Sequence, residues 1–350
     1  AVTDVLTDVA LGFIAFSIGG EFRISHIKQV GTSSITITFF QACLATLLVD
    51  AALLACGFPA PLSLTLGAIA TAPAATLMVV RQYHAKGEVT STLLPVVAMD
   101  DAVGLMLFSI SLPISQALAS NAALTVTSML LQPLLEIVLS LAVGAGIGLL
   151  IALAMRFFHS KVNRISVAVA AVLLGSALAS IWNLSSLLLC MAIGAVLVNL
   201  RNDADELLEI TDAWTPPLFM LFFVLSGAEL DLAVVPTVGL LGVVYMVARS
   251  LGKYFGSFLG ATIAKSSPNI RKYLGLTLLP QAGVAIGMAQ VALNALPEYG
   301  TQIQAVVLTA TLIYELVGPV ITKLALTAAG EIQDSKKSKA KTEQSAGGAK

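Results

Sequence analysis

The chain has 350 residues, of which 57% are hydrophobic and 11% charged, and this composition excludes an ordinary soluble domain. The formal net charge of −1 excludes no class of partner. Apolar stretches long enough to cross a bilayer recur along most of the chain, without the alternation of apolar and polar residues found in outer-membrane barrels. The predicted fold class is therefore an all-α polytopic membrane protein.

Eleven membrane spans are predicted in chain order. They cover residues 4–22, 31–56, 60–81, 90–114, 128–156, 163–181, 184–200, 214–229, 234–263, 272–295 and 302–328. The segment 331–350 is rich in Lys, Ser, Ala and Gly, and is predicted to be a disordered tail.

The loop charges support this set of spans. If the spans alternate in direction, one side of the membrane carries nearly all of the basic residues and the other side carries none. The basic side holds Arg23, Lys28, Arg81, Lys86, Arg156, Lys161, Arg164, Arg201, Lys265, Arg271, Lys272, Lys323 and the tail lysines. By the positive-inside rule this side is cytoplasmic, and so is the C-terminus.

An internal repeat relates the first span to the eighth. The first ends in the sequence GFIAFSIGGEF at 12–22, and the eighth ends in LFFVLSGAEL at 221–230. A proline lies inside a later span of each copy, Pro73 at 52 residues after Glu21 and Pro280 at 51 residues after Glu229. Because the copies start seven spans apart, they face opposite ways through the membrane. Inverted repeats with a broken helix in each half are typical of transporters whose site lies between the halves.

The two broken spans are candidate site elements. Thr71, Pro73 and Thr76 mark the first break, and Pro280 and Gln281 mark the second. Proline removes a backbone hydrogen bond, and irregular backbone at membrane depth persists where it is buried in protein or lines water. The threonine hydroxyls and freed carbonyls are therefore candidate cation contacts; the alternative for each break is a plain proline kink.

Two adjacent aspartates, Asp100 and Asp101, lie within the span 90–114. Each charge at the centre of a membrane helix costs roughly 2.5–3.5 kcal/mol on insertion scales. This cost favours a site that binds a cation, a proton, or each in turn. A structural salt bridge, or an aspartate held protonated by its neighbour, is the alternative.

Two basic residues, Arg249 and Lys253, lie inside the ninth span, one helical turn apart. We expect Lys253 to pair with one aspartate when the two halves pack together, because a nearby carboxylate favours a buried ammonium; a snorkelling lysine is the alternative. For Arg249 we expect a structural role, paired with Glu315, Asp50 or Glu136, in preference to direct transport. Arg249 and Glu315 are secondary site candidates.

These features resemble the monovalent cation:proton antiporter superfamily, in the branch related to the NhaA and NapA sodium/proton antiporters. The resemblance is carried by the Asp100-Asp101 pair, Lys253, the Thr71-Ala72-Pro73 break and the segment beginning Pro280-Gln281, and it covers residues 1–328. It implies that Asp101 is the main ligand of the monovalent cation, that Asp100 partners Lys253, and that exchange is electrogenic.

The resemblance also implies an architecture and an assembly. A moving core would comprise about 31–114 and 234–328, a dimer or panel part would comprise about 1–30 and 128–229, and the protein would be a homodimer. Related chains carry one or two further N-terminal helices, so a missing N-terminal segment is expected. NhaA has Asp after the Thr of the first break where this chain has Ala72, which leaves the cation open.

The resulting hypothesis is a secondary active antiporter in the cell (inner) membrane. It would exchange Na⁺, or alternatively Li⁺ or K⁺, for protons by alternating access, with no cofactor and no nucleic-acid partner. A potassium channel of the same fold is the runner-up. An intramembrane aspartyl protease is disfavoured because such enzymes place their two aspartates on different helices, so no enzyme activity is expected.

Overall fold

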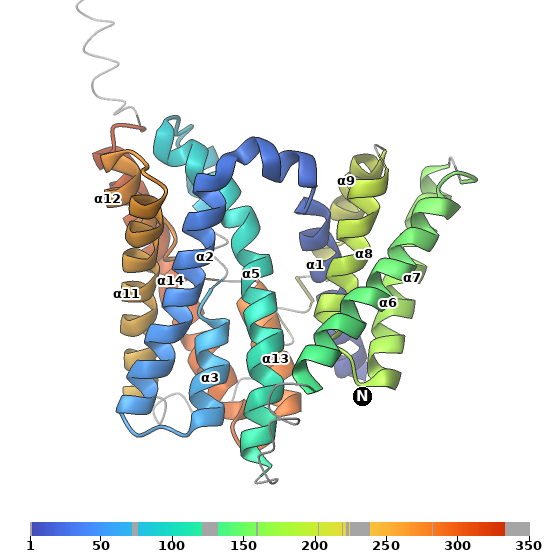
Figure 1. The fold of residues 1–350 in the computed structure, drawn as a ribbon, viewed down its shortest axis with the longest axis horizontal. Coiled ribbons are helices and arrows are strands. Elements are labelled where there is room, and N and C mark those ends of the chain that lie inside the picture. The colour runs from blue at the N-terminus through green and yellow to red at the C-terminus, as the bar shows by residue number, and fades with distance from the viewer. Residues whose placement is uncertain are drawn as a thin grey trace, which may run out of the picture.

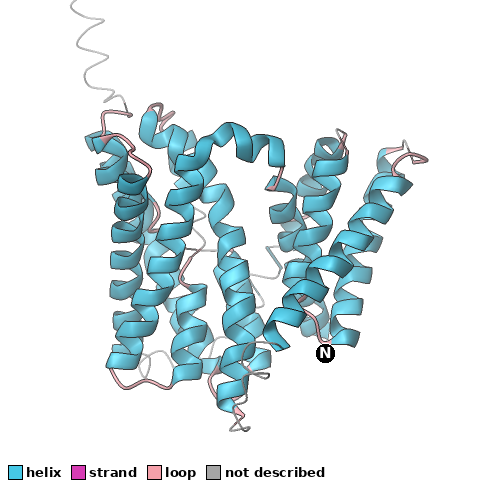
Figure 2. Ribbon diagram, viewed as in Figure 1, coloured by secondary structure: helices cyan, strands magenta, loops and turns pink. Residues whose placement is uncertain are grey.

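The computed structural model describes residues 2–71, 76–120, 132–158, 160–201, 203–218, 220–221, 224, 239–281 and 283–332. Within these ranges all regular secondary structure is helical, as Figure 2 shows. The helices are α1 (Val2–Glu21), α2 (Ile24–Ala55), α3 (Ala60–Ile69), α4 (Thr76–Gln82), α5 (Glu88–Ala119), α6 (Gln132–Ala154), α7 (Lys161–Trp182), α8 (Ser186–Leu200), α9 (Ala204–Trp214), α11 (Gly239–Ile263), α12 (Pro268–Thr277), α13 (Val284–Ala295) and α14 (Gly300–Ala328).

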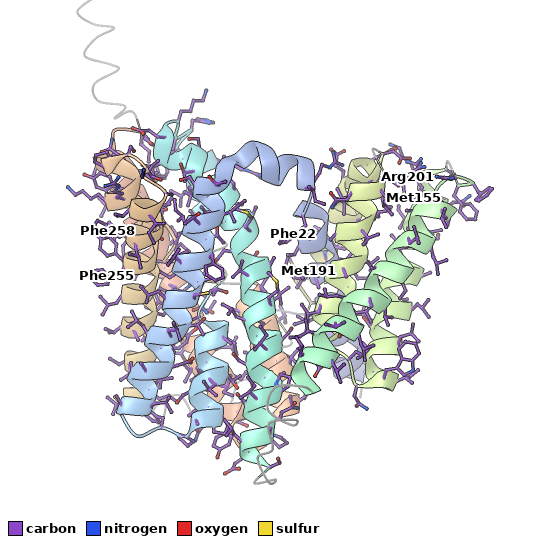
Figure 3. All side chains as sticks on the ribbon, in the orientation of Figure 1. Phe22, Met155, Met191, Arg201, Phe255 and Phe258 are labelled. Atoms are coloured by element: carbon purple, nitrogen blue, oxygen red, sulfur yellow. The ribbon has the colours of Figure 1, made fainter. Side chains whose placement is uncertain are left out.

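The prediction of a polytopic helical membrane protein is confirmed. Among the described residues, five helices are long and apolar enough to cross a bilayer, namely α2, α5, α6, α7 and α14. Large apolar side chains are exposed along the outer helices; in Figure 3, Phe255 and Phe258 of α11 lie at the edge of the molecule, and they are 50% and 45% exposed. Such faces suit a lipid environment. Half of the predicted eighth span, 214–229, falls outside the described residues.

The helices form two bundles side by side (Figure 1). One contains α2 to α5 and α11 to α14, and the other contains α1 and α6 to α9. Helix α5 stands where they meet and contacts α1, α6 and α8. The bundles contain most of the residues predicted for the core and panel parts, respectively. That division into moving parts stays a prediction, and the core bundle begins before residue 31. Its first helix, α2, starts at Ile24 with a stretch that runs sideways across the top of Figure 1.

A row of glycines joins the two halves of the core bundle. Helices α2 and α11 share the most extensive contact in the molecule. A Cβ atom at Gly252, Gly256 or Gly260 would collide with the backbone of α2 at Ala45, Gln41 or Ile37, respectively. Small residues four apart let membrane helices approach to backbone contact. Because the two backbones touch, side chains that face each other on α2 and α11 lie at the same depth in the bundle.

Each of the two predicted broken spans is a pair of short helices. Helix α3 ends at Ile69 and α4 begins at Thr76, while α12 ends at Thr277 and α13 begins at Val284. Pro73 lies outside the described residues. The hydroxyl of Thr76 donates to the carbonyl of Thr277 at 2.6 Å, and Gln281 Nε2 donates to the carbonyl of Ile69 at 3.1 Å. The two breaks therefore meet, as expected for crossing broken helices.

Two features of the surface differ from the sequence prediction. Helix α9 was not predicted; it follows Asp203, which accepts hydrogen bonds from Arg164 and Arg201 at 2.8 Å. The predicted tail also begins too early, because Glu331 is only 8% exposed and packs on the start of α5. Residues 333–350, the rest of that tail, lie outside the described residues.

Candidate functional site

Asp100 lies at the centre of the contact between α2, α5 and α11. Its side chain is fully buried, about 18 Å along α5 from Glu88 at 1.5 Å per residue. Lys253 Nζ lies 2.7 Å from Asp100 Oδ2, and both side chains are completely excluded from solvent. Gln41 Nε2 donates to the other carboxylate oxygen, Oδ1. Both oxygens of the buried carboxylate are therefore engaged by donors from the two helices joined at the glycine row.

The neighbouring Asp101 has a different environment. It is half-buried, whereas Asp100 is fully buried. Successive residues on an α-helix point about 100° apart, so the two carboxylates face different surroundings. One aspartate is committed to a dry ion pair, and the other has partial access to solvent.

A threonine hydroxyl of the first break lies beside this helix. Thr71 is buried, and a Cβ atom at Gly104 would collide with its Oγ1. Gly104 lies one helical turn after Asp100 and Asp101. Among the described residues Thr71 Oγ1 has no hydrogen-bond partner. Because a buried hydroxyl without a partner is costly, this oxygen is available to a ligand at the site.

The second break is held by Arg249. The guanidinium is fully buried; Nη1 donates to the carbonyl of Leu279 at 2.7 Å and Nη2 to that of Pro280 at 3.3 Å. It also lies over the ring of Tyr314, with Cζ 4.4 Å from the centroid. These carbonyls follow the C-terminal end of α12, where the helix dipole favours a cation.

The prediction that an acidic side chain pairs with Arg249 is therefore wrong within the described residues. Its ligands are backbone carbonyls rather than Glu315, Asp50 or Glu136. Glu315 lies half-buried on α14, and its Oε1 has no hydrogen-bond partner among the described residues. A place for Glu315 in the site stays a prediction.

Gln281, in the second break, donates a hydrogen bond to the end of the helix that precedes the first break. Its Nε2 donates to the carbonyl of Ile69, at the end of α3, and to the hydroxyl of Tyr245 at 2.8 Å. Each interrupted helix, α3 and α12, thus ends on a donor from the other half of the core. Hydrogen bonds therefore tie the two breaks to each other.

A cavity of about 840 Å³ lies below the site, toward the end of the molecule opposite the basic loops. It is lined by the second half of α5, the start of α6, the connection between α7 and α8 with the start of α8, and one residue of α13. Its lining includes one carboxylate, Glu136, with Ser109 and Ser185. These two serine Oγ atoms lie 3.3 Å apart and join α5 of the core bundle to the start of α8. The cavity therefore separates the two bundles on one side of the site.

Sequence reasoning missed Gln41. An uncharged amide in an apolar span is a weak signal, and its partner Asp100 lies 59 residues away in the chain. The available signal was a polar amide inside the apolar span 31–56. The transport roles assigned to Asp100, Asp101, Lys253 and the break residues stay predictions.

Comparisons with known proteins give one family match and one similar fold. The model of the sodium/hydrogen exchanger transmembrane family matches residues 1–328. The fold is similar to that of the sodium proton antiporter MjNhaP1 from Methanocaldococcus jannaschii at pH 8, with a TM-score of 0.68 and 22% identity, over 93% of this chain and 85% of that one. No curated protein matches the sequence.

Proposed function

Because the chain belongs to the sodium/hydrogen exchanger family and is a monovalent cation/proton antiporter, we propose that its two ions compete at Asp101. This assignment rests on the different environments of the two adjacent carboxylates. Asp100 is buried between Lys253 and Gln41, whereas Asp101 is half-buried beside it. The predicted superfamily is confirmed; the narrower NhaA/NapA branch stays a prediction.

The cation ligands follow from the same geometry. Asp101 supplies the carboxylate. The hydroxyl of Thr71, which has no hydrogen-bond partner among the described residues, lies against α5 one turn away. Oxygen donors of these two kinds suit a hard cation such as Na⁺. Sodium is the proposed substrate, with Li⁺ and K⁺ as weaker alternatives.

Coupling follows from the cost of moving charge through the membrane. With a proton on Asp101 and the Asp100–Lys253 pair closed, the site is neutral. When a cation binds Asp101, its positive charge takes the place of that proton. A carboxylate with neither ion is an uncompensated charge in a low-dielectric interior, which disfavours crossing.

Electrogenic exchange requires a second proton, and the buried pair is its proposed source. If Asp100 turns toward the arriving cation, Lys253 loses the carboxylate that keeps it protonated. The Lys253 proton then leaves with the Asp101 proton. The cation-bound site holds two carboxylates around one cation and carries one net negative charge, whereas the proton-bound site is neutral. Two protons therefore exchange for one cation, and a net charge moves.

The proposed setting is the cell (inner) membrane, with the C-terminus in the cytoplasm. The distribution of Lys and Arg supports this orientation. In Figure 3, Arg201 lies at the same end of the molecule as the start of α2 and the last described residues. A homodimer joined through the panel bundle is proposed from the resemblance to related antiporters. The family assignment does not support the potassium channel.

The test uses liposomes with an acidic interior that contain the purified full chain. External Na⁺ is added, then K⁺, and internal pH is followed with a fluorescent dye. We expect Na⁺ to raise the internal pH, and Asp101→Asn to abolish the response, because an amide can neither carry a proton nor neutralise a cation. Asp203→Asn, which changes a carboxylate at the cytoplasmic surface, is the matched control.

The possible outcomes separate the competing assignments. Undiminished exchange by Asp101→Asn would remove that residue from the site. A response to K⁺ but not to Na⁺ would keep the mechanism and change the substrate. Cation flux in the wild type with no pH change would contradict proton coupling.

A further inference from the structure

The helix that carries both aspartates begins without a side-chain cap of its own. The residue at its N-cap position is Gly87, and the first turn of an α-helix leaves backbone N–H groups without intrahelical acceptors. Glu331, which lies more than 240 residues later, supplies the acceptors. Its Oε1 accepts from the N–H of Val89 at 2.6 Å, and its Oε2 accepts from the N–H of Thr90 at 2.8 Å.

Further contacts fix Glu331 in this position. The Thr90 hydroxyl donates to Oε2 at 2.7 Å, and the N–H of Lys86 donates to the backbone carbonyl of Glu331 at 3.1 Å. A Cβ atom at Gly87 would collide with the Glu331 carboxylate, so the absence of a side chain there makes room for it. Glu331 is 8% exposed, which is unusual for a glutamate outside a span.

The end of α14 directs Glu331 to this site. Gly330 adopts a left-handed conformation with φ of 78°, which turns the chain out of the helix. The N–H of Glu331 then donates to the carbonyl of Leu326, and that of Gly330 to Thr327, both at 3.0 Å. This Schellman closure brings the carboxylate back toward the membrane-spanning helices instead of into the tail.

We propose that Glu331 is a positioning residue for ion exchange, holding α5 against α14 so that Asp100 and Asp101 keep their place. A carboxylate at a helix N-terminus gains from both the N–H donors and the helix dipole. The hydrogen bonds of Glu331 link the end of α14, in the second repeat, to the start of α5, the helix of the first repeat that carries both aspartates. Asp100 lies about 18 Å below the capped end on the same helix, which continues through Pro95, so a shift of that end is carried toward the site.

This inference rests on the proposed antiport, and the test measures both together. Exchange is assayed in liposomes over a range of external Na⁺ for the wild type, Glu331→Ala, Glu331→Gln and the control Glu88→Ala. Glu88 is an exposed acid in the same first turn of α5, one residue after the cap position. Rates are normalised to the amount of folded protein in the vesicles.

We expect Glu331→Ala to raise the KM for Na⁺ by up to roughly fivefold, the limit reached when the whole free energy of a typical helix cap is expressed at the site. Glu331→Gln keeps one acceptor oxygen and lies between it and the wild type, whereas Glu88→Ala leaves KM unchanged. Amide hydrogen exchange at Val89 and Thr90 is expected to speed up in Glu331→Ala and not in Glu88→Ala. Should Glu331→Ala fail to fold, Thr90→Val removes one donor and is expected to raise KM in the same direction.

An unchanged KM in the folded Glu331 variants, with only less protein recovered, would reduce Glu331 to a structural role and overturn the inference. A fivefold rise in Glu88→Ala as well would assign the effect to surface charge and also overturn it. Absence of exchange in the wild type would instead overturn the proposed antiport.

Discussion

Asp100 shows at the scale of single residues how a charge is kept inside this protein. One oxygen of its carboxylate contacts the lysine ammonium from α11, and the other accepts a hydrogen bond from the glutamine amide of α2. Each oxygen therefore has a donor. Breaking a buried ion pair by removing one partner typically costs about 3–5 kcal/mol, because the other charge is left uncompensated. Stability and charge transport are therefore linked at Asp100.

Lys253→Ala tests that link. We expect the free energy of unfolding to fall by about 3–5 kcal/mol, and the ratio of charge to protons exchanged to fall because one proton carrier is lost. Thermal unfolding in detergent and the reversal potential in liposomes measure the two effects. Lys265→Ala, which changes an exposed lysine between α11 and α12, is the control. An unaltered charge-to-proton ratio would separate Lys253 from coupling.

Some residues of the site could be predicted from the sequence, and others could not. Lys253 and the aspartates stood out because charge inside an apolar span is costly and must find an opposite charge. The ligands of Arg249 were not foretold, since the carbonyls of Leu279 and Pro280 become acceptors only once the helix breaks. Glu331 was assigned to the tail because composition gives no sign that a helix elsewhere lacks a cap.

At the scale of helices, composition and proline positions predicted most elements, including both broken spans. Helix α9 was missed because it is short and amphipathic, lies in a polar connection, and depends on contacts with α7. Arg164 at the start of α7 binds Asp203 at 2.8 Å and Glu206 at 3.0 Å. Such an ion network is a tertiary feature, and local sequence does not reveal it.

This network predicts that the stability of the protein depends on pH. The hydrogen bonds from Arg201, with the nearby charge of Arg164, hold the pKa of Asp203 below its usual range despite partial burial. A carboxyl group with a lowered folded pKa stabilises the protein above its unfolded pKa of about 4, and the contribution disappears as pH falls through the folded value.

Asp203→Asn should therefore lower the stability at pH 7 by at most about 1 kcal/mol, because the group is partly exposed. The variant and the wild type are expected to converge below about pH 3. Thermal unfolding followed by circular dichroism across pH measures this, with Glu209→Gln, an exposed acid on α9, as control. A constant difference at all pH values would argue against the ion network as its source.

At the scale of the whole molecule, two pairs of serines compare contacts within and between the bundles. Ser109 and Ser185 join α5 to α8 across the two bundles, with their Oγ atoms 3.3 Å apart. Ser33 and Ser266 lie within the core bundle, with Oγ atoms 2.8 Å apart. Alternating access by movement of the core against the panel requires the first contact to open and leaves the second intact.

Cysteine pairs at these positions test that movement. In a background without Cys43, Cys56 and Cys190, oxidation of the Ser109→Cys and Ser185→Cys double variant is expected to stop exchange, and reduction to restore it. The Ser33→Cys and Ser266→Cys double variant should form its disulfide and still transport. The proton flux assay in liposomes measures both. Full activity of the first double variant after its disulfide has formed would rule out separation of the bundles at this point.

The glycine row on α11 is also relevant to the leakage of protons through the protein. A coupled exchanger must prevent protons from hopping along a file of water past its binding site. Where Gly252, Gly256 and Gly260 lie against Ala45, Gln41 and Ile37, there is no room for a Cβ atom between the backbones. Such a file cannot fit where a methyl group cannot, so these close contacts leave no path for water between α2 and α11 at these positions.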